Sequence, residues 1–530
     1  MANSGMDCDV IIIGAGHNGL TCAAYLARAG RSVRVFERRA VVGGAAVTEE
    51  FHPGFRNSTC SYTVSLLDPK VATDLDLAGQ GLRIVRRPVS NFLPLPDGRA
   101  LTLHPDSGKT RAEIAHFSPR DGERYADYEA TLHRLADVLR DLVRQTPPNA
   151  GGGLADWWRA YRVSVPLRRQ DPETWRDLLD IFTLSAADFL ARWFEHDAVK
   201  ALFAFDGVVG TFTSPYAPGS AYVLLHHCFG GIDGEAGAWG HAIGGMGAIS
   251  DALAAAVEAA GARIETDCGV VEVLVENGAS VGVRLADGRE VRARAIAANV
   301  NPKLLLLDLV PAVTLPADIR ERMDRYRCSS GTLRMNVALR ELPDFISEPG
   351  TEVQPHHGAG IVIAPSLDYM DDAYTDARRH GWSRAPIVER LIPSVLDDSL
   401  APPGHHVASL FCQHFNPDLP DGGTWDDHRE AAADVVIDTV TRFAPNFADA
   451  VIARQILTPL DLEREFCLIG GDIFHGAMRM NQLFSARPLL GYGAYRMPVK
   501  GLYLCGAGAH PGGGVTGLPG HNAAREILRD

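Results

Sequence analysis

Lysine is scarce in this 530-residue sequence, and so is any excess of positive charge. Of the 51 basic residues only five are lysines: Lys70, Lys109, Lys200, Lys303 and Lys500. We interpret this scarcity as the codon bias of a GC-rich, bacterial genome. The 65 acidic residues outnumber the 51 basic ones, which gives a net charge of −14. Nucleic-acid binding needs a positive field that displaces counterions, so the composition argues against a nucleic-acid partner.

Paired cysteines and long apolar runs are also missing. The nine cysteines are scattered without a C-x-x-C pair, so neither a zinc ribbon nor a disulfide framework is indicated. No apolar run reaches the length of about 18 residues that a membrane-spanning helix needs, and no basic segment precedes the first apolar stretch. We therefore expect a cytoplasmic protein with no transmembrane segment and no signal peptide.

The overall composition is that of a folded protein. Apolar residues make up 46% and charged residues 22% of the chain, which excludes wholesale disorder. Domains usually contain about 100–200 residues, so the length predicts two or more cooperating units.

The N-terminal segment has the pattern of a dinucleotide-binding unit. An apolar run at 9–13 leads into the turn Gly14-Ala15-Gly16-His17-Asn18-Gly19, a helical stretch at 20–29, and a second β-rich run at 32–36 that ends at Glu37. Such a turn lets the backbone approach a pyrophosphate, whose charge the helix N-terminus stabilises. Glu37 is placed to accept hydrogen bonds from the ribose and to repel a 2′-phosphate, although Arg38 and Arg39 counter that repulsion. The pattern alone leaves FAD and NAD both open.

Two further glycine-rich segments fit the same site. Gly43, Gly44 and Ala45 would bring backbone amides to a phosphate or a ribityl chain, or would form a plain turn. Near the end of the chain, an apolar run at 501–505 leads into a loop that contains Gly506, Pro511, Val515, Thr516 and Gly517, and then into a short helix. A helix N-terminus favours negative charge, so this loop would stabilise a reduced, anionic flavin.

Together these segments resemble the phytoene-desaturase-like branch of the FAD-dependent oxidoreductases. Within that branch the sequence is most similar to the subgroup of pyridine nucleotide-disulfide oxidoreductase domain-containing protein 2. The matching stretches are 14–37, 43–50, 210–215, 222–227, 237–250, 473–475 and 501–520. The segment Gly244-Gly245-Met246-Gly247 and the terminal loop are the most specific of them. No redox disulfide is expected, because no cysteine pair is spaced for one.

The resemblance implies an α/β fold in which a discontinuous Rossmann-type domain binds FAD non-covalently. An interleaved α+β substrate domain and a helical cap complete it. The predicted FAD-binding pieces are 1–70, 235–310 and 455–530, and the substrate and cap pieces are 71–234 and 311–454. In the resembled proteins the strand at Val270 and Val271 contacts the adenine through its main chain, and Asn299 ends a strand close to the cofactor. Core packing alone is the alternative for these valines.

The local patterns agree with this organisation. An alanine-rich helix is predicted at 248–260, followed by strands at 270–275, 280–285 and 291–298. Apolar residues at helical spacing predict a helix at 121–145, which the Pro- and Gly-rich segment 147–153 ends. Aromatic residues between 154 and 205 could line an apolar cavity, although most of them are expected to pack in the core: Trp157, Trp158, Trp175, Phe189, Trp193, Phe194, Phe203 and Phe205.

Flavin chemistry needs few catalytic side chains, because the cofactor accepts the electrons. Three histidines are candidates for accepting a substrate proton, namely His241, His475 and His510, and a hydrogen-bonded structural role is the alternative for each. No metal site is expected, since the side chains of adjacent histidines diverge.

We therefore predict an FAD-dependent oxidoreductase of the desaturase or dehydrogenase type. It would transfer hydride between the flavin and a largely apolar small molecule, with oxygen or a quinone as electron acceptor. A lipid-like substrate would bring the protein into reversible contact with a membrane. The alternatives are a non-redox flavin-dependent isomerase and a flavin-loaded regulatory or interaction protein.

Overall fold

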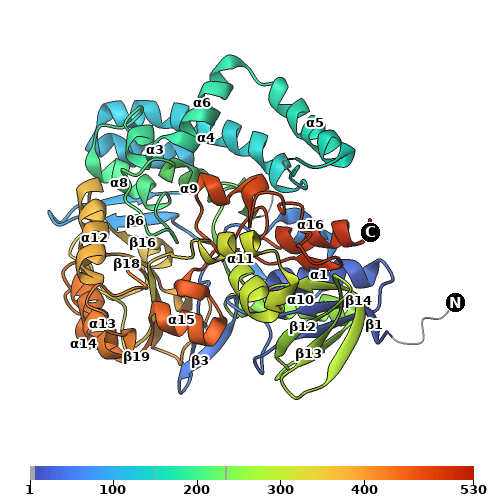
Figure 1. The fold of residues 1–530 in the computed structure, drawn as a ribbon. Helices are drawn as coiled ribbons and strands as arrows, with labels where there is room; N and C mark the ends of the chain where they lie inside the picture. Colours follow the sequence, from blue (N-terminus) through green and yellow to red (C-terminus); the bar gives the residue numbers. More distant parts are fainter. Residues whose placement is uncertain (1–5, 150, 233–234) are drawn as a thin grey trace.

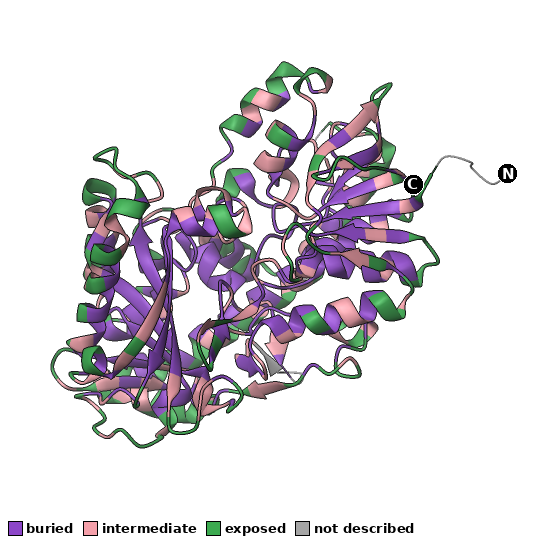
Figure 2. Ribbon diagram, turned by 90° about the horizontal axis from the view of Figure 1, so that it is seen from below, coloured by how far each residue is buried: buried purple, intermediate pink, exposed green. Residues whose placement is uncertain are grey.

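The computed structural model describes residues 6–149, 151–232 and 235–530. Its main features are two large β-sheets and a group of helices above them (Figure 1). Both sheets are largely buried, and exposed residues concentrate on the outer surfaces of the helices and in the loops (Figure 2). This mixed α/β architecture is the fold class that the sequence predicts.

The first sheet has seven strands in the order β11-β2-β1-β14-β13-β12, and β20 also pairs with β14. Strands β11, β2, β1, β14 and β20 are parallel, whereas β12, β13 and β14 form an antiparallel meander. Helix α1 packs against α10 and α16. The bounds are β1 Cys8–Ile13, α1 His17–Arg28, β2 Val33–Phe36, α10 Gly247–Ala259, β11 Arg263–Glu265, β12 Val270–Glu276, β13 Ala279–Leu285, β14 Glu290–Ala298, β20 Leu502–Leu504 and α16 Leu518–Ile527.

The strand and helix predictions for this region are confirmed. Helix α10 and strands β12, β13 and β14 lie within one or two residues of their predicted bounds. Helix α1 begins at His17 instead of residue 20, because the backbone of Gly16 is extended and serves as the N-cap. His17, Asn18 and Gly19 therefore belong to the first helical turn and not to a loop before it.

The second sheet has seven strands in the order β19-β15-β18-β17-β16-β6-β7 and is antiparallel except for the β16–β6 pair. Every residue of β15 is buried, so both faces of the sheet are covered at this strand. The bounds are β6 Asn91–Pro94, β7 Ala100–Leu103, β15 Thr332–Leu339, β16 Gly360–Ile363, α12 Leu367–His380, β17 Trp382–Leu391, β18 His406–Phe415, α13 Trp425–Thr441 and β19 Val451–Leu457.

Helices α3 to α9, in the described part of the chain between residues 107 and 226, form the helical group (Figure 1). Helix α4 was predicted at 121–145 and begins slightly earlier, because Pro119 suits a first turn and the Ser118 side chain caps it. The bounds are α3 Ser107–Phe117, α4 Pro119–Val143, α5 Leu154–Arg168, α6 Pro172–Thr183, α7 Ala186–Leu190, α8 Asp197–Phe205 and α9 Ser220–His226.

Seven of the eight aromatic residues predicted for this helical group divide into two sets, and Phe203 is half-buried. Phe189, Trp193, Phe194 and Phe205 are buried, as expected of core residues. Three tryptophans are instead exposed, with exposed fractions of 74% at Trp157, 61% at Trp158 and 46% at Trp175. These three tryptophans therefore do not line an internal cavity.

Shorter elements connect these units. They are β3 Thr48–His52, β4 Phe55–Ser58, α2 Pro69–Asp74, β5 Ile84–Arg86, β8 Gly231–Ile232, β9 Glu235–Ala236, β10 Gly240–Ala242, α11 Ala317–Asp324, α14 Phe447–Ala450 and α15 Pro459–Phe466. The first sheet takes its strands from the three predicted FAD-binding pieces. Strand β19 crosses the boundary predicted between residues 454 and 455, and the division into domains stays a prediction. Within the described residues, no helix combines the length and the apolar character needed to cross a membrane.

Candidate functional site

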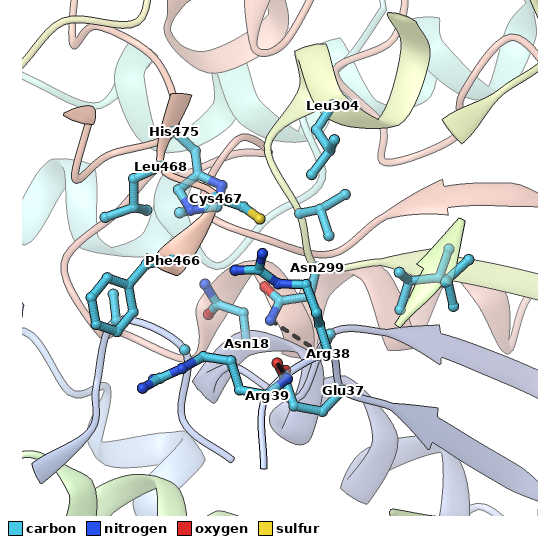
Figure 3. A pocket seen from close by; sticks show the side chains of 18 of the residues that line it. Asn18, Glu37, Arg38, Arg39, Asn299, Leu304, Phe466, Cys467, Leu468 and His475 are labelled. Carbon is cyan, nitrogen blue, oxygen red and sulfur yellow. Dashed lines mark hydrogen bonds between the residues drawn. The ribbon is translucent and has the colours of Figure 1, made fainter. Parts of the chain in front are cut away.

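A cavity of about 230 Å³ opens at the carboxyl ends of β1, β2 and β14, where ligands bind in doubly wound α/β folds. Its walls come from the glycine turn, the end of β2, the end of β14 and the segment after α15 (Figure 3). Ten of the predicted site residues line it: Gly14, Gly16, His17, Asn18, Glu37, Arg38, Gly44, Ala45, Asn299 and His475.

Asn299 explains why the turn requires glycines. Its side chain lies beside Gly16 and Gly19 of the turn and beside Gly506 of the terminal loop. A Cβ on Gly16 would lie 2.7 Å from Asn299 Nδ2, a Cβ on Gly19 would lie 3.0 Å from Asn299 Cβ, and a Cβ on Gly506 would lie 2.9 Å from Asn299 Oδ1. The N-terminal turn and the terminal loop thus meet at one carboxamide, which also donates to the Gly14 carbonyl oxygen at 3.4 Å.

Glu37 is buried at the end of β2 and holds the turn from the other side. Its Oε2 accepts a hydrogen bond from the Ala15 N–H at 2.8 Å, and its Oε1 accepts one from the Arg39 N–H at 2.9 Å. Each carboxylate oxygen can accept a second hydrogen bond, so the predicted ribose contact remains available. The sequence did not indicate these two backbone contacts.

Several polar atoms around the cavity lack a partner in the protein. Within the described part of the chain, His17 Nε2, Asn18 Oδ1, Arg39 Nη1 and His475 Nδ1 are buried without a hydrogen bond. Buried polar atoms are normally satisfied, so unsatisfied ones that surround one cavity indicate a polar ligand. Together with the glycine cradle, these atoms fit a bound dinucleotide.

One wall of the cavity was not predicted. It consists of Phe466, the last residue of α15, and of Cys467 and Leu468 after it, and it lies opposite Asn18 and Asn299 (Figure 3). Cys467 ends α15 in a left-handed conformation with φ of 56°, which turns the chain over the cavity. The Arg39 guanidinium lies 4.7 Å from the centre of the Phe466 ring and forms an ion pair with Glu49 at 2.6 Å. Nothing in the local sequence distinguishes this segment from an ordinary helix end.

Of the three candidate histidines, only His475 lies at this cavity. Burial lowers the pKa of His475 to about 4, so its ring is neutral at pH 7. His510 is buried in the terminal loop and its Nε2 lies 3.2 Å from the Leu142 carbonyl oxygen. His241 lies on β10, with Nε2 at 3.1 Å from Asp397 Oδ2. The catalytic assignments of all three stay predictions.

The remaining predicted cofactor-binding residues do not line the cavity. The Ala15 N–H is held by Glu37, and the Gly43 N–H donates to the Ala15 carbonyl oxygen at 2.9 Å. Val270 lines the cavity, whereas Val271 does not and is 50% exposed. Helix α16 begins at Leu518, after Gly517 in a left-handed conformation. The five predicted residues of the loop before it do not line the cavity: Gly506, Pro511, Val515, Thr516 and Gly517.

In the part of the chain that the structure describes, no group of three or more His, Cys, Asp or Glu side chains is placed so that it could hold a metal ion. All nine cysteines are free.

Comparisons with known proteins support the same cofactor. Residues 19–332, more than half of the chain, match the family model described as flavin containing amine oxidoreductase. The chain is 42% identical to the mouse (Mus musculus) pyridine nucleotide-disulfide oxidoreductase domain-containing protein 2, over 98% of this chain and 93% of that protein.

Two bacterial relatives and a solved structure extend this result. A limonene dehydrogenase subunit of Castellaniella defragrans is 28% identical over 99% of this chain and 95% of its own. Phytoene desaturase (lycopene-forming) of Pseudescherichia vulneris is 27% identical over 96% of both chains. Cyclohexylamine oxidase from Brevibacterium oxydans shares the fold, with a TM-score of 0.56, 18% identity and 99% of each chain covered. The chain belongs to the flavin-containing amine oxidoreductase family and is an FAD-dependent oxidoreductase similar to the phytoene desaturases.

Proposed function

We propose that the enzyme oxidises a largely apolar small molecule by transferring hydride to FAD, with oxygen or a quinone as the final electron acceptor. The main support is similarity over nearly the whole chain to a limonene dehydrogenase subunit and to a phytoene desaturase (lycopene-forming). Limonene and phytoene are hydrocarbons, so a relative of both is suited to oxidation at carbon–carbon bonds.

A second cavity, of about 400 Å³, supports an apolar substrate. Its apolar wall includes Tyr222, Val223, Met478, Met480 and Leu483. Met478 also borders the terminal loop, because a Cβ on Gly512 would lie 3.2 Å from its sulfur. A substrate in this cavity would therefore lie one side chain away from the loop that the resemblance assigns to the flavin.

FAD, when bound, supplies the two-electron acceptor for such a reaction. The protein would have to exclude water, position the substrate and accept one proton. The unpartnered Nδ1 of His475 is suited to accept the proton, since burial keeps the ring neutral at pH 7. In this role His475 accepts a proton at the cavity wall, and its ring carries no permanent positive charge.

One observation favours a second candidate, the oxidation of an amine. A cavity of about 260 Å³ lies between α4, α8 and Trp239, and its wall includes Asp206 and the rings of Tyr125, Tyr128 and Phe203. Burial raises the pKa of Asp206 to about 7, although the charge of nearby Arg87 acts in the opposite direction. Among the described residues no donor reaches its carboxylate. A carboxylate beside aromatic rings is suited to a protonated amine.

Anaerobic flavin reduction tests the proposal and separates the two candidates. We expect a terpenoid or carotenoid hydrocarbon to bleach the absorbance of the bound flavin, whereas small amines leave it unchanged. Bleaching by amines alone, lost in Asp206→Asn, would establish the second candidate. Product formation without bleaching would establish a non-redox isomerase. Admission of oxygen or a quinone to the reduced enzyme then identifies the electron acceptor.

The role of Glu37 gives a separate prediction. Glu37→Ala removes the acceptor of two backbone N–H groups and the proposed ribose contact. We expect FAD binding to weaken by about 1–3 kcal/mol, the range for breaking a charged hydrogen bond. Isothermal titration of the apoprotein with FAD measures the change. Glu50→Ala, which removes an exposed carboxylate from β3, is the matched control, and equal affinities in both variants would reject the role.

A further inference from the structure

Helix α5 has an apolar stripe that faces solvent. Leu154, Trp157, Trp158 and Tyr161 are exposed by 89%, 74%, 61% and 49%. Their spacing of i, i+3, i+4 and i+7 places them on one face of the helix. Helices α5 and α6 project from the rest of the molecule at the upper right of Figure 1. Globular proteins normally turn such a stripe toward the core, so this one requires an explanation.

A small cavity ringed by arginines adjoins α5 beside this stripe. It has a volume of about 50 Å³, and its lining is Gln145, Thr146, Arg159, Arg162, Arg525 and Arg529. Arg162 follows Trp158 by one helical turn, so the stripe and the cavity share an edge. The size suits a single phosphate group and excludes a dinucleotide.

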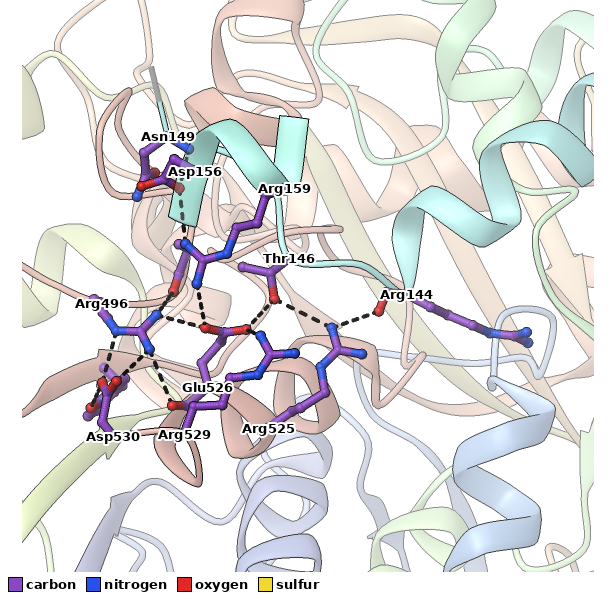
Figure 4. A network of polar contacts seen from close by, with 12 residues as sticks. Arg144, Thr146, Asn149, Asp156, Arg159, Arg496, Arg525, Glu526, Arg529 and Asp530 are labelled. Atoms are coloured by element: carbon purple, nitrogen blue, oxygen red, sulfur yellow. Dashed lines mark hydrogen bonds and ion pairs between the residues drawn. The ribbon is translucent and has the colours of Figure 1, made fainter. Parts of the chain in front are cut away.

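Positive charge in this cavity is only partly balanced. The buried carboxylate of Glu526 accepts hydrogen bonds from Arg159 at 3.0 Å and from Arg496 at 2.8 Å, and it also pairs with Arg529 (Figure 4). Arg525 donates only to the Arg144 carbonyl oxygen and to Thr146. Within the described residues, Arg162 forms no ion pair or hydrogen bond.

The positive charge at α5 contrasts with the charge of the rest of the protein. The protein as a whole carries a net charge of −14, whereas α5 and the residue after it contribute the exposed Arg162, Arg168 and Arg169. Aromatic side chains beside arginines on an exposed helix are the composition of a segment that lies in a lipid–water interface.

We propose that the exposed stripe of α5 and the adjoining arginine cavity form a docking site for an anionic phospholipid bilayer. The stripe inserts among the acyl chains, and the cavity binds the phosphate of one headgroup through Arg162 and Arg525. Arginine side chains around a cavity can pair with a phosphate group through two parallel hydrogen bonds from each guanidinium. This site is separate from the FAD cavity and does not depend on the proposed substrate.

Vesicle flotation of the FAD-loaded protein tests the proposal. We expect binding to vesicles that contain phosphatidylglycerol and much weaker binding to pure phosphatidylcholine. Arg162→Gln should weaken binding about fivefold, as expected for one basic residue near an anionic surface. Trp158→Ser should weaken it as well. Arg379→Gln removes an exposed charge from α12, far from α5 in Figure 1. This control should bind vesicles with an affinity within about twofold of that of the unchanged protein.

Competition with inorganic phosphate distinguishes the sources of the anion. At equal ionic strength we expect phosphate to displace the protein from the vesicles more effectively than chloride. Phosphate binding without vesicle binding would overturn the lipid assignment, and so would equal affinity for both vesicle types. Dimerisation that depends on concentration and is lost in Trp158→Ser would show that a second copy of the chain covers the stripe, which would also overturn it. Flavin content and melting temperature verify that each variant is folded.

Discussion

Arg487→Met is expected to lower the free energy of unfolding by at least about 3 kcal/mol and to release FAD. Arg487 is fully buried and bonds to Ala507 of the terminal loop and to the segment that carries His475, both of which border the candidate FAD cavity. Its guanidinium donates to the carbonyl oxygens of Ala507 at 2.8 Å, Phe474 at 2.6 Å, Gly476 at 3.2 Å and Gln482 at 3.1 Å.

The effect on the cofactor follows from what these carbonyl groups hold in place. Ala507 and His475 line the candidate FAD cavity, and His475 lies between Phe474 and Gly476, two of the bonded residues. Methionine fills a similar volume but donates no hydrogen bond, so four buried carbonyl oxygens would lose a partner. The segment that carries His475 would then no longer be fixed against the terminal loop.

Urea denaturation and the ratio of flavin to protein absorbance measure the two effects. Arg487→Lys keeps the charge but not the planar set of donors, so it should retain part of the stability and little of the FAD. Arg479→Met, in the same segment but exposed, should change the free energy of unfolding by less than about 0.5 kcal/mol. Full flavin content in Arg487→Met would show that the terminal loop keeps its shape without the hydrogen bonds of Arg487, which would contradict the prediction.

The sequence predicts those parts of the candidate site that are formed by short, continuous segments with a recognisable residue pattern. The glycine turn, Glu37 and the strands at 270–298 are recognisable because a tight turn and alternating apolar residues leave a direct pattern in the chain. FAD followed from a resemblance that the comparisons confirm. The same patterns predicted α10 and the meander after it almost to the residue.

The parts that the sequence did not predict depend on contacts between distant segments. Arg487 is one of 51 basic residues, and only the folded chain shows that it bonds to four carbonyl groups. Cys467 lines the cavity because α15 ends there in a left-handed conformation, which no sequence pattern required. The exposed tryptophans of α5 have helical spacing like any core residue, so their orientation was not predictable from the chain alone.

Acidification is expected to destabilise the protein steeply below about pH 6.5. Burial lowers the pKa of seven histidines to about 3 or 4: His17, His226, His356, His357, His414, His475 and His510. In the unfolded chain these groups titrate near 6.5. Between that pH and about 4 the unfolded state therefore binds more protons, and the free energy of unfolding falls as the pH falls.

At least three buried carboxylates oppose this trend but are outnumbered. Burial raises the pKa of Asp206 to about 7 and that of Asp472 to about 6, and it also raises the pKa of Glu389, so the native state binds their protons first. A net uptake of only two protons on unfolding corresponds to about 2.7 kcal/mol per pH unit, and we expect at least this slope between pH 6 and pH 5. Urea denaturation at successive pH values measures it. His510→Asn should reduce the slope by up to about 1.4 kcal/mol per pH unit, whereas replacement of the exposed His116 on α3 should leave it unchanged. A constant free energy of unfolding from pH 7 to pH 5 would mean that the buried histidines accept protons in the folded protein, and His475 would then be cationic at the FAD cavity under mildly acidic conditions.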